Sequence, residues 1–165
     1  MFRDLSSRHT IRLQTFDYSS PNWYYVTICT NERESNFGEI HDGKMFFSPA
    51  GRMIELEWVK LRIRYINIRL GKFVVRPNHF HGIIQSIRAG IKPAPTLGTI
   101  IGSYKSITTH EYIAGINKYD WQAFNHRLWQ RNYYEHIIRN DEDFDHIQKY
   151  ITNNPLNWVK DKFNM

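Results

Sequence analysis

The sequence predicts an α+β domain, in which an antiparallel sheet packs against helices. Three observations support this class: short stretches rich in aromatic and β-branched residues, turn signals between several of them, and apolar residues at helical spacing in three other segments. The 165 residues suit one domain, and 41% hydrophobic residues exclude a disordered chain. We therefore expect a single domain over residues 1–165, with its core at about residues 20–160.

The first elements expected are a strand and a hairpin. Residues 23–30, WYYVTICT, are rich in the residue types that strands favour. Residues 37–40 and 44–47 flank Asp42-Gly43, a dipeptide typical of the tight turn in a hairpin. The beginning of the chain is therefore expected to be β-structure.

A first helix is expected after Ser48, because serine caps a first helical turn and Pro49 suits the first position inside it. Its buried side is predicted from the apolar residues at helical spacing, which are Met53, Leu56, Val59 and Ile63. The acidic residues expected to be solvated helix charges are Glu55, Glu57 and Glu111.

Two further strands are expected in the middle of the chain, at residues 66–75 and 80–87. The tripeptide between them interrupts any strand ladder, because Pro77 has no backbone N–H. Residues 88–96 hold one glycine and two prolines and are expected to form a loop.

The last third of the chain predicts a helix, a strand and a final helix. The first of these helices is indicated by an apolar face formed by Leu97, Ile100, Ile101, Tyr104 and Thr108. After a polar connection at residues 117–125, residues 128–129 and 133–138 indicate a strand with an irregular beginning. Asn140 and Asp143 can cap the final helix. Its apolar stripe and its end are marked by Phe144, Ile147, Ile151 and Pro155.

The expected order of elements is strand, hairpin, helix, two strands, helix, strand and helix. A sheet of few strands with separated helices is typical of the α+β class. A ferredoxin-like fold, an antiparallel sheet with its helices on one face, accounts for this order.

The charge balance favours a nucleic-acid partner. The chain has 22 Lys and Arg against 16 Asp and Glu, a net charge of +6, and 15% of its residues are aromatic. Cations neutralise phosphates, and aromatic rings stack on bases. The same composition also fits a mildly basic globular protein with no such partner.

Composition and motifs also exclude several classes of protein. Cys29 is the one cysteine, so an intrachain disulfide and a multi-cysteine zinc site are both excluded, and its apolar strand indicates a core position. No apolar run is long enough to span a membrane, and the first residues lack the shape of a signal peptide, so we expect a cytoplasmic protein. Residues 97–106 do not form a phosphate-binding loop, because Lys105 does not directly follow the second glycine. No nucleotide cofactor is therefore expected.

The most specific segment is residues 77–84, PNHFHGII. Side chains alternate along a strand, so His79 and His81 face one side and Phe80 faces the other. Two imidazoles at this spacing can form half of a metal site while Phe80 enters the core. The alternative is a pair of surface histidines on an edge strand.

Tyr150 and Asn154 are one helical turn apart, so they share a face of the final helix. That face lies at the boundary of the apolar stripe, where a phenol is packed on one side and reachable on the other. Tyr150 can act as a nucleophile, and the Asn154 carbonyl can be a third metal ligand. The alternatives are a tyrosine that only packs on the sheet and an asparagine at a frayed helix end, because it precedes a proline.

These motifs resemble the single-tyrosine HUH transposases of bacteria, and in particular their REP-associated tyrosine transposase branch. The resemblance rests on the His79-x-His81 pair after Pro-Asn, on the Tyr150-x-x-x-Asn154-Pro pattern about seventy residues later, and on residues 25–30 and 129–140. It covers roughly residues 20–160. It implies a ferredoxin-like fold of the HUH endonuclease type, with the catalytic tyrosine on the C-terminal helix.

The resemblance also assigns roles to single residues. It implies that His79, His81 and Asn154 hold a divalent metal, Mg²⁺ or Mn²⁺, and that Tyr150 is the nucleophile. Related insertion-sequence enzymes often carry glutamine where this chain has Asn154, so the carbonyl ligand here has a shorter reach. The tyrosines at residues 133–134 are rival nucleophiles by chemistry, but they precede the final helix and lack a polar partner four residues on.

The resemblance further implies the reaction and its partners. The tyrosine would attack a phosphodiester of single-stranded DNA next to a hairpin, such as a repetitive extragenic palindrome, and form a covalent 5′-phosphotyrosine that a 3′-OH can reverse. The candidate DNA contacts are Lys105, Arg131 and His136. Such enzymes act in the cytoplasm, at the nucleoid when bound to DNA, as monomers or homodimers. The alternatives are a hairpin-binding protein of the same fold that does not cleave, a plasmid-type nicking enzyme and a metal-dependent hydrolase that uses water.

Overall fold

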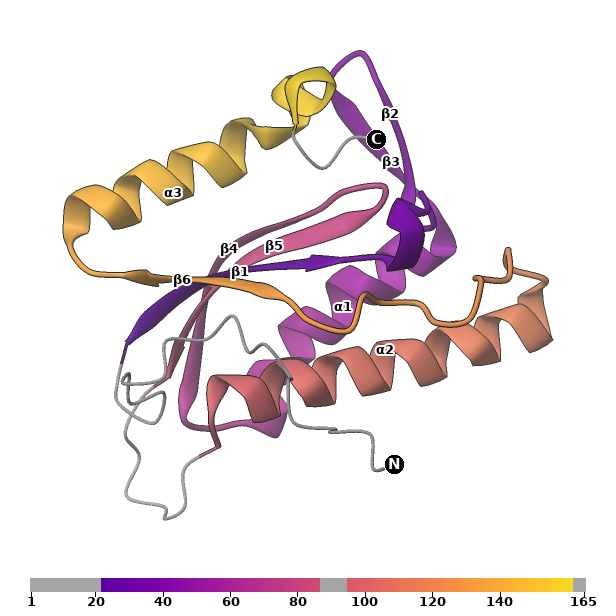
Figure 1. The fold of residues 1–165 in the computed structure, drawn as a ribbon, viewed down its shortest axis with the longest axis horizontal. Coiled ribbons are helices and arrows are strands. Elements are labelled where there is room, and N and C mark those ends of the chain that lie inside the picture. The colour runs from indigo at the N-terminus through magenta and orange to yellow at the C-terminus, as the bar shows by residue number, and fades with distance from the viewer. Residues whose placement is uncertain (1–21, 87–94, 162–165) are drawn as a thin grey trace, which may run out of the picture.

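The structure is a computed structural model that describes residues 22–86 and 95–161 (Figure 1). The loop predicted at residues 88–96 lies mostly outside the described residues. The strands are β1 (Trp23–Cys29), β2 (Gly38–His41), β3 (Lys44–Phe47), β4 (Ile68–Val75), β5 (His79–Ser86) and β6 (Tyr134–Ile138). The α-helices are α1 (Pro49–Arg64), α2 (Leu97–Tyr119) and α3 (Asp141–Asn153), and the 3₁₀ helices are η1 (Asn31–Arg33) and η2 (Asn154–Lys160).

The main sheet is antiparallel, with the strand order β4-β5-β1-β6. Its strands and the helices α1 and α2 form a βαββαβ arrangement, and the hairpin of β2 and β3 is inserted between β1 and α1. The predicted α+β class and antiparallel sheet are therefore confirmed. The hairpin turn is confirmed as well, because Asp42 and Gly43 both adopt the positive φ that a type I′ turn requires.

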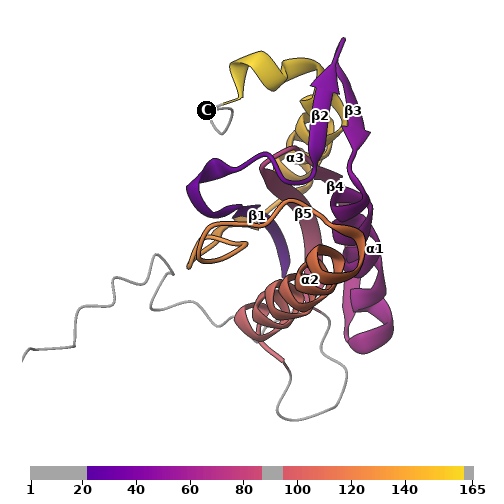
Figure 2. The same cartoon turned by 90° about the vertical axis from the view of Figure 1, so that its right-hand side faces the viewer.

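The helices lie on both faces of the main sheet (Figures 1 and 2). α1 and α2 share one face, as predicted for the helices in general, whereas α3 crosses the opposite face. The reason is that β5 is apolar on both sides: Phe80 and Ile84 join the core under α1 and α2, and Ile83 packs with Ile147 and Ile151 of α3. The second apolar face gives the stripe of α3 a place to be buried.

The buried side of α1 differs from the prediction. Leu56 and Ile63 are exposed, and the buried apolar positions are Ala50, Ile54, Trp58 and Leu61. Trp58 decides the rotation of the helix, because its large ring is fully buried, 4.5 Å from the ring centre of Phe80. The apolar residues of α1 occupy more than one face, so spacing alone selected the wrong one.

Glu57 of α1 is also buried, which contradicts its expected place in solvent. Its carboxylate accepts hydrogen bonds from Lys60 and from Arg64, each 2.7 Å long. These two cations lower the pKa of Glu57 despite the opposing effect of burial. Rotation of α1 to bury Trp58 carries the neighbouring Glu57 inward, and the two basic side chains compensate its charge.

The remaining helices begin where the sequence predicts. Ser48 and Asn140 accept capping hydrogen bonds at the starts of α1 and α3. α3 ends at Asn153, and the chain continues directly into the 3₁₀ helix η2. The predicted face of α2 is confirmed, since all five of its residues are buried: Leu97, Ile100, Ile101, Tyr104 and Thr108. No helix among the described residues is long and apolar enough to cross a membrane.

Candidate active site

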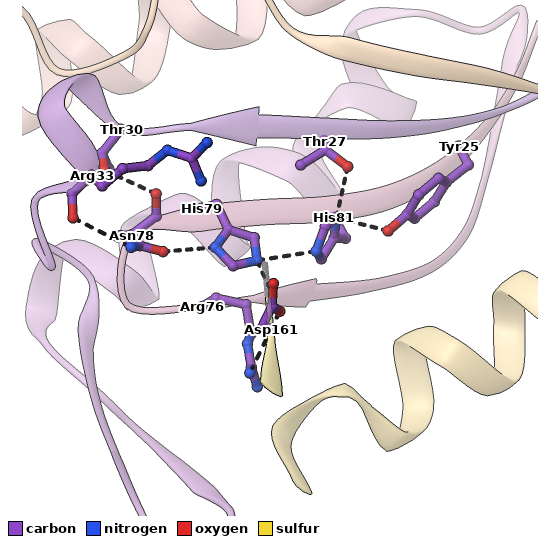
Figure 3. Close-up of polar contacts among 9 residues, drawn as sticks. All are labelled: Tyr25, Thr27, Thr30, Arg33, Arg76, Asn78, His79, His81 and Asp161. Carbon is purple, nitrogen blue, oxygen red and sulfur yellow. Dashed lines mark hydrogen bonds and ion pairs between the residues drawn. The ribbon is translucent and has the colours of Figure 1, made fainter. Parts of the chain in front are cut away.

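His79 and His81 lie side by side on β5, one of the two central strands (Figure 3). Both side chains are fully buried, and their Nε2 atoms are 3.0 Å apart. Phe80 points to the opposite face and lies in the core, as strand alternation predicts. The predicted common face of the two imidazoles on a central strand is therefore confirmed, and the alternative of an exposed edge pair is excluded.

A chain of hydrogen bonds orients the ring of His79. The Asn78 amide nitrogen donates to the Arg33 carbonyl, so its Oδ1 is the acceptor that faces Nδ1 of His79 at 2.7 Å. Nδ1 of His79 must therefore carry the proton, and Nε2 of the neutral ring presents its lone pair to the site. Such a carbonyl behind an imidazole is the usual support of a metal-ligating histidine.

His81 is supported by hydroxyl groups instead of a carbonyl. Its Nδ1 lies 2.8 Å from the hydroxyls of both Tyr25 and Thr27, which project from the neighbouring strand β1. A hydroxyl can donate or accept, so either tautomer of His81 is satisfied at Nδ1. His81 can thus protonate Nδ1 and turn the lone pair of Nε2 toward a cation shared with His79.

Burial lowers the pKa of His79 below its ordinary value of 6.5, although the nearby Asp161 carboxylate acts in the opposite direction. The unfolded chain therefore binds a proton near pH 6 that the native, metal-free protein does not. The free energy of unfolding should fall as the pH decreases below about 6.5, by up to about 1.4 kcal/mol per pH unit for this one group. Urea unfolding in EDTA between pH 7.5 and 5 measures this dependence.

The variant His79→Gln should show a flatter dependence on pH over this range, because the titrating ring is absent. His110→Gln serves as the control, since His110 is exposed on α2, far along the chain from the site. An equal slope in the parent and in His79→Gln would contradict the assignment.

Asp161 is a member of the site that the sequence did not reveal. Its side chain is only 2% exposed, and its Oδ2 lies 3.6 Å from Nε2 of His79. Donor atoms of His79, His81 and Asp161 lie within 4.8 Å of one another. Asp161 follows η2 and has no regular spacing from either histidine, so no sequence pattern connects it with them.

Asn154 is placed at the junction of α3 and η2, where the predicted third ligand belongs. The residue is 1% exposed, and its buried Oδ1 has no hydrogen-bond partner among the described residues. A buried acceptor without a partner is costly, and a divalent cation would satisfy it. The donor set of two imidazoles and amide or carboxylate oxygens therefore fits a divalent metal.

Tyr150 lies on α3 and is 37% exposed. Its ring centre is 5.7 Å from that of His81 and 6.4 Å from that of Tyr25, with the rings nearly perpendicular. Burial raises the pKa of Tyr150, as does the charge of Asp161, whereas hydrogen bonding by Asn154 and the charge of Arg76 lower it. The phenol is thus held against the histidine pair and remains accessible.

The site opens into a cavity of about 530 Å³ between β1, β6, α3 and η2. Tyr150, Asn154 and Asp161 line it, and so does His136 of β6. His136 forms a hydrogen bond of 2.8 Å with Asp143, which also lines the cavity. Of the three candidate DNA contacts, the structure therefore brings His136 next to the nucleophile.

The other two candidate contacts lie elsewhere. The Lys105 ammonium donates to the carbonyls of Gln130 at 2.7 Å and Arg131 at 3.2 Å. Lys105 therefore holds the segment before β6 onto α2, and burial lowers its pKa to about 8. The side chain of Arg131 is exposed on this segment. Neither residue lines the cavity beside Tyr150.

The rival tyrosines are also separated from the cavity lining. Tyr134 of β6 pairs directly with Thr27, so it projects from the same face of the sheet as His81. It is about half exposed, and the cavity is lined by Tyr150 and not by Tyr134. Tyr150 is the tyrosine whose ring contacts the histidine pair.

A ferredoxin-like sheet with a histidine pair on a central strand, faced by a tyrosine on a separate helix, defines a class of DNA strand-transfer proteins. Residues 23–154 match the family model described as "Transposase IS200 like". The chain therefore belongs to the IS200-like transposase family.

Relatives and solved structures are similar in extent. An uncharacterized protein of Haemophilus influenzae Rd is 33% identical over 175 residues, which cover 94% of this chain and 92% of that protein. The structure of a REP-associated tyrosine transposase bound to a REP hairpin has a TM-score of 0.58 at 20% identity, over 82% of this chain and 67% of the other. A predicted transposase of Deinococcus radiodurans R1 has a TM-score of 0.50 at 12% identity, over 87% of this chain and 97% of the other.

Proposed function

We propose that this chain is a metal-dependent transposase of the REP-associated tyrosine branch, which cleaves and rejoins single-stranded DNA through a covalent bond to Tyr150. The observation that carries the proposal is the position of the Tyr150 ring, 5.7 Å from His81 and in the same cavity as Asn154 and Asp161. A protein that only binds hairpins needs neither a nucleophile nor a set of buried cation ligands at this point.

The residues that would hold the divalent metal are His79, His81 and Asn154, with Asp161 as an additional oxygen donor. Imidazole suits transition metals and amide and phosphate oxygens suit hard cations, so the set favours Mn²⁺ or Mg²⁺. When bound, the cation supplies Lewis acidity that polarises the scissile phosphate and favours the phenolate of Tyr150.

The chain's own contribution is a positioned nucleophile. The Tyr150 oxygen forms a bond to phosphorus, and the bond from phosphorus to the 3′ oxygen breaks. The phenolic proton leaves to solvent, and the released 3′ oxygen takes up a proton to become a 3′-OH. Attack by another 3′-OH reverses these steps and rejoins the strand without an external energy source.

We place the action of the protein at single-stranded DNA beside a hairpin of the repetitive extragenic palindrome type. The net charge of +6 supports an anionic partner, and the similar solved transposase is bound to a REP hairpin. The whole chain acts as one domain in the cytoplasm, at the nucleoid when bound to DNA, as a monomer or a homodimer. His136 contacts DNA from the cavity beside Tyr150.

The test is an assay for a covalent adduct. Purified protein is incubated with Mn²⁺ and a panel of labelled single-stranded oligonucleotides that carry a hairpin, and the products are separated under denaturing conditions. The proposal predicts a protein–DNA band that needs the metal and disappears on protease treatment. Hairpin binding with intact DNA would identify a binding protein, and cleavage without an adduct would identify a hydrolase; either result would overturn the proposal.

DNA binding should depend strongly on salt and prefer hairpin or single-stranded DNA to plain duplex. With about four phosphate contacts to a single strand, affinity should fall by about 10–100-fold between 50 and 200 mM salt. Unpaired bases also offer ring faces on which exposed aromatic side chains can stack. Fluorescence anisotropy with a hairpin, and with a blunt duplex as competitor, measures both effects. Equal competition by the duplex would indicate only a basic surface.

A further inference from the structure

Arg76 lies next to the site and is used by none of the steps above. It follows β4 directly and opens the turn that leads to β5, and its backbone N–H donates to the His79 carbonyl at 2.8 Å. Its side chain is fully buried (Figure 3). The same turn that presents the histidine pair therefore brings a buried guanidinium to its side.

The guanidinium of Arg76 lacks hydrogen-bond acceptors. None of its three nitrogen atoms has a hydrogen-bond partner among the described residues. The ring of Trp158 lies 4.6 Å from its central carbon, which covers one face of the group but accepts none of its in-plane N–H bonds. A buried cation whose donors are unused carries a large cost in free energy, which an anionic ligand would remove.

The position of Asp161 indicates where such an anion binds. Its Oδ2 lies 3.9 Å from Nη2 of Arg76 and 3.6 Å from Nε2 of His79. An anionic oxygen at this point is therefore shared between the guanidinium and the histidine pair. The charge of Arg76 also lowers the pKa of Tyr150, which places the guanidinium within electrostatic reach of the nucleophile.

We propose that Arg76 is a catalytic residue that donates hydrogen bonds to the non-bridging oxygens of the scissile phosphate. The inference rests on the proposed function. In the DNA-free structure the Asp161 carboxylate holds the neighbouring position, and a phosphate oxygen takes that place when DNA binds. As the Tyr150 oxygen bonds to phosphorus and the 3′ oxygen leaves, negative charge accumulates on these oxygens, and the planar fork of Arg76 stabilises it.

The first experiment compares the variants Arg76→Gln and Arg76→Lys with the parent in the Mn²⁺-dependent adduct assay. Arg76→Gln should form the adduct about 10²–10³-fold more slowly, with hairpin and Mn²⁺ affinities close to those of the parent. Arg76→Lys restores the charge without the fork and should be intermediate. Arg69→Gln is the matched control, because Arg69 is an exposed arginine of β4. Adduct formation by Arg76→Gln at the parent rate would overturn the inference.

A second comparison separates contact with the phosphate from a structural role. The scissile phosphodiester is replaced by a methylphosphonate, each diastereomer being tested separately, so that one non-bridging oxygen and the negative charge are lost. For at least one diastereomer, the rate difference between the parent and Arg76→Gln should shrink to nearly nothing. If Arg76→Gln does not fold, Arg76→Lys is used in its place. The same rate difference on the phosphodiester and on both methylphosphonates would show that Arg76 is only structural.

Two outcomes remain distinct from these. If Arg76 acts only by holding Asp161, the change Arg76→Gln should have no further effect in an Asp161→Asn background, whereas direct contact predicts an equal loss in both backgrounds. If the parent forms no adduct with any hairpin, the proposed function fails before Arg76 is tested. A parent that reacts while Arg76→Gln also reacts normally overturns the role of Arg76 alone.

Discussion

The variant Tyr150→Phe should form no covalent DNA adduct, while its affinities for the hairpin and for Mn²⁺ stay close to those of the parent. The substitution removes the phenolic oxygen and little volume, and the ring is partly exposed, so the fold should survive. Without this oxygen the chain has no nucleophile beside His81. Denaturing electrophoresis with labelled DNA measures the adduct, and anisotropy measures binding by the same preparation.

Tyr134→Phe is the matched control for this prediction. Tyr134 projects from the same face of the sheet as His81 but does not line the cavity beside Tyr150, so this variant should form the adduct normally. If Tyr150→Phe forms the adduct at the parent rate, the assignment is wrong. Peptide mapping of the adduct would then distinguish Tyr133 from Tyr134.

Replacement of His81 by alanine should abolish both tight Mn²⁺ binding and DNA cleavage. One of two adjacent imidazoles is lost, and the remaining donors cannot hold the cation; loss of a supporting group alone typically costs 10–100-fold in metal affinity, so loss of a ligand should cost about 100-fold or more. The hydroxyls of Tyr25 and Thr27 also lose their partner, which should cost about 1–3 kcal/mol of stability. Isothermal titration with Mn²⁺ and urea unfolding measure the two effects.

Hairpin binding should persist in His81→Ala, because lysine and arginine contacts to phosphates carry most of the affinity for DNA. His79→Ala should behave in the same way, and His110→Ala, which changes an exposed histidine of α2, should bind Mn²⁺ like the parent. Retention of parent Mn²⁺ affinity by both His79→Ala and His81→Ala would show that the metal site is elsewhere.

Residues close together in the chain were predicted well because backbone geometry relates them directly. Alternation along β5 places His79 and His81 on one face whatever surrounds the strand. One turn of helix places Tyr150 and Asn154 on one side of α3, and local side-chain hydrogen bonds mark the starts of α1 and α3. The histidine pair, the tyrosine and its neighbour could therefore be recognised as one candidate site.

Where several faces of a helix are apolar, periodicity did not select the buried one. The sequence placed Leu56 and Ile63 of α1 inside, and the structure exposes both and buries Trp58 with Glu57 instead. The outcome depends on the space between α1, α2 and the sheet, which a large ring fills better than the predicted residues. No local rule contains that volume.

The sequence by itself determined the class of fold, the elements that carry the site and the local geometry of its histidines and tyrosine. Only the tertiary structure decided that α3 crosses the opposite face of the sheet from α1 and α2, and thereby brings Tyr150 to His81. It also decided that Arg76 and Asp161 meet beside His79. The physical reason is that spacing along the chain sets direction within one element, whereas contacts between elements follow from which surfaces can be buried together.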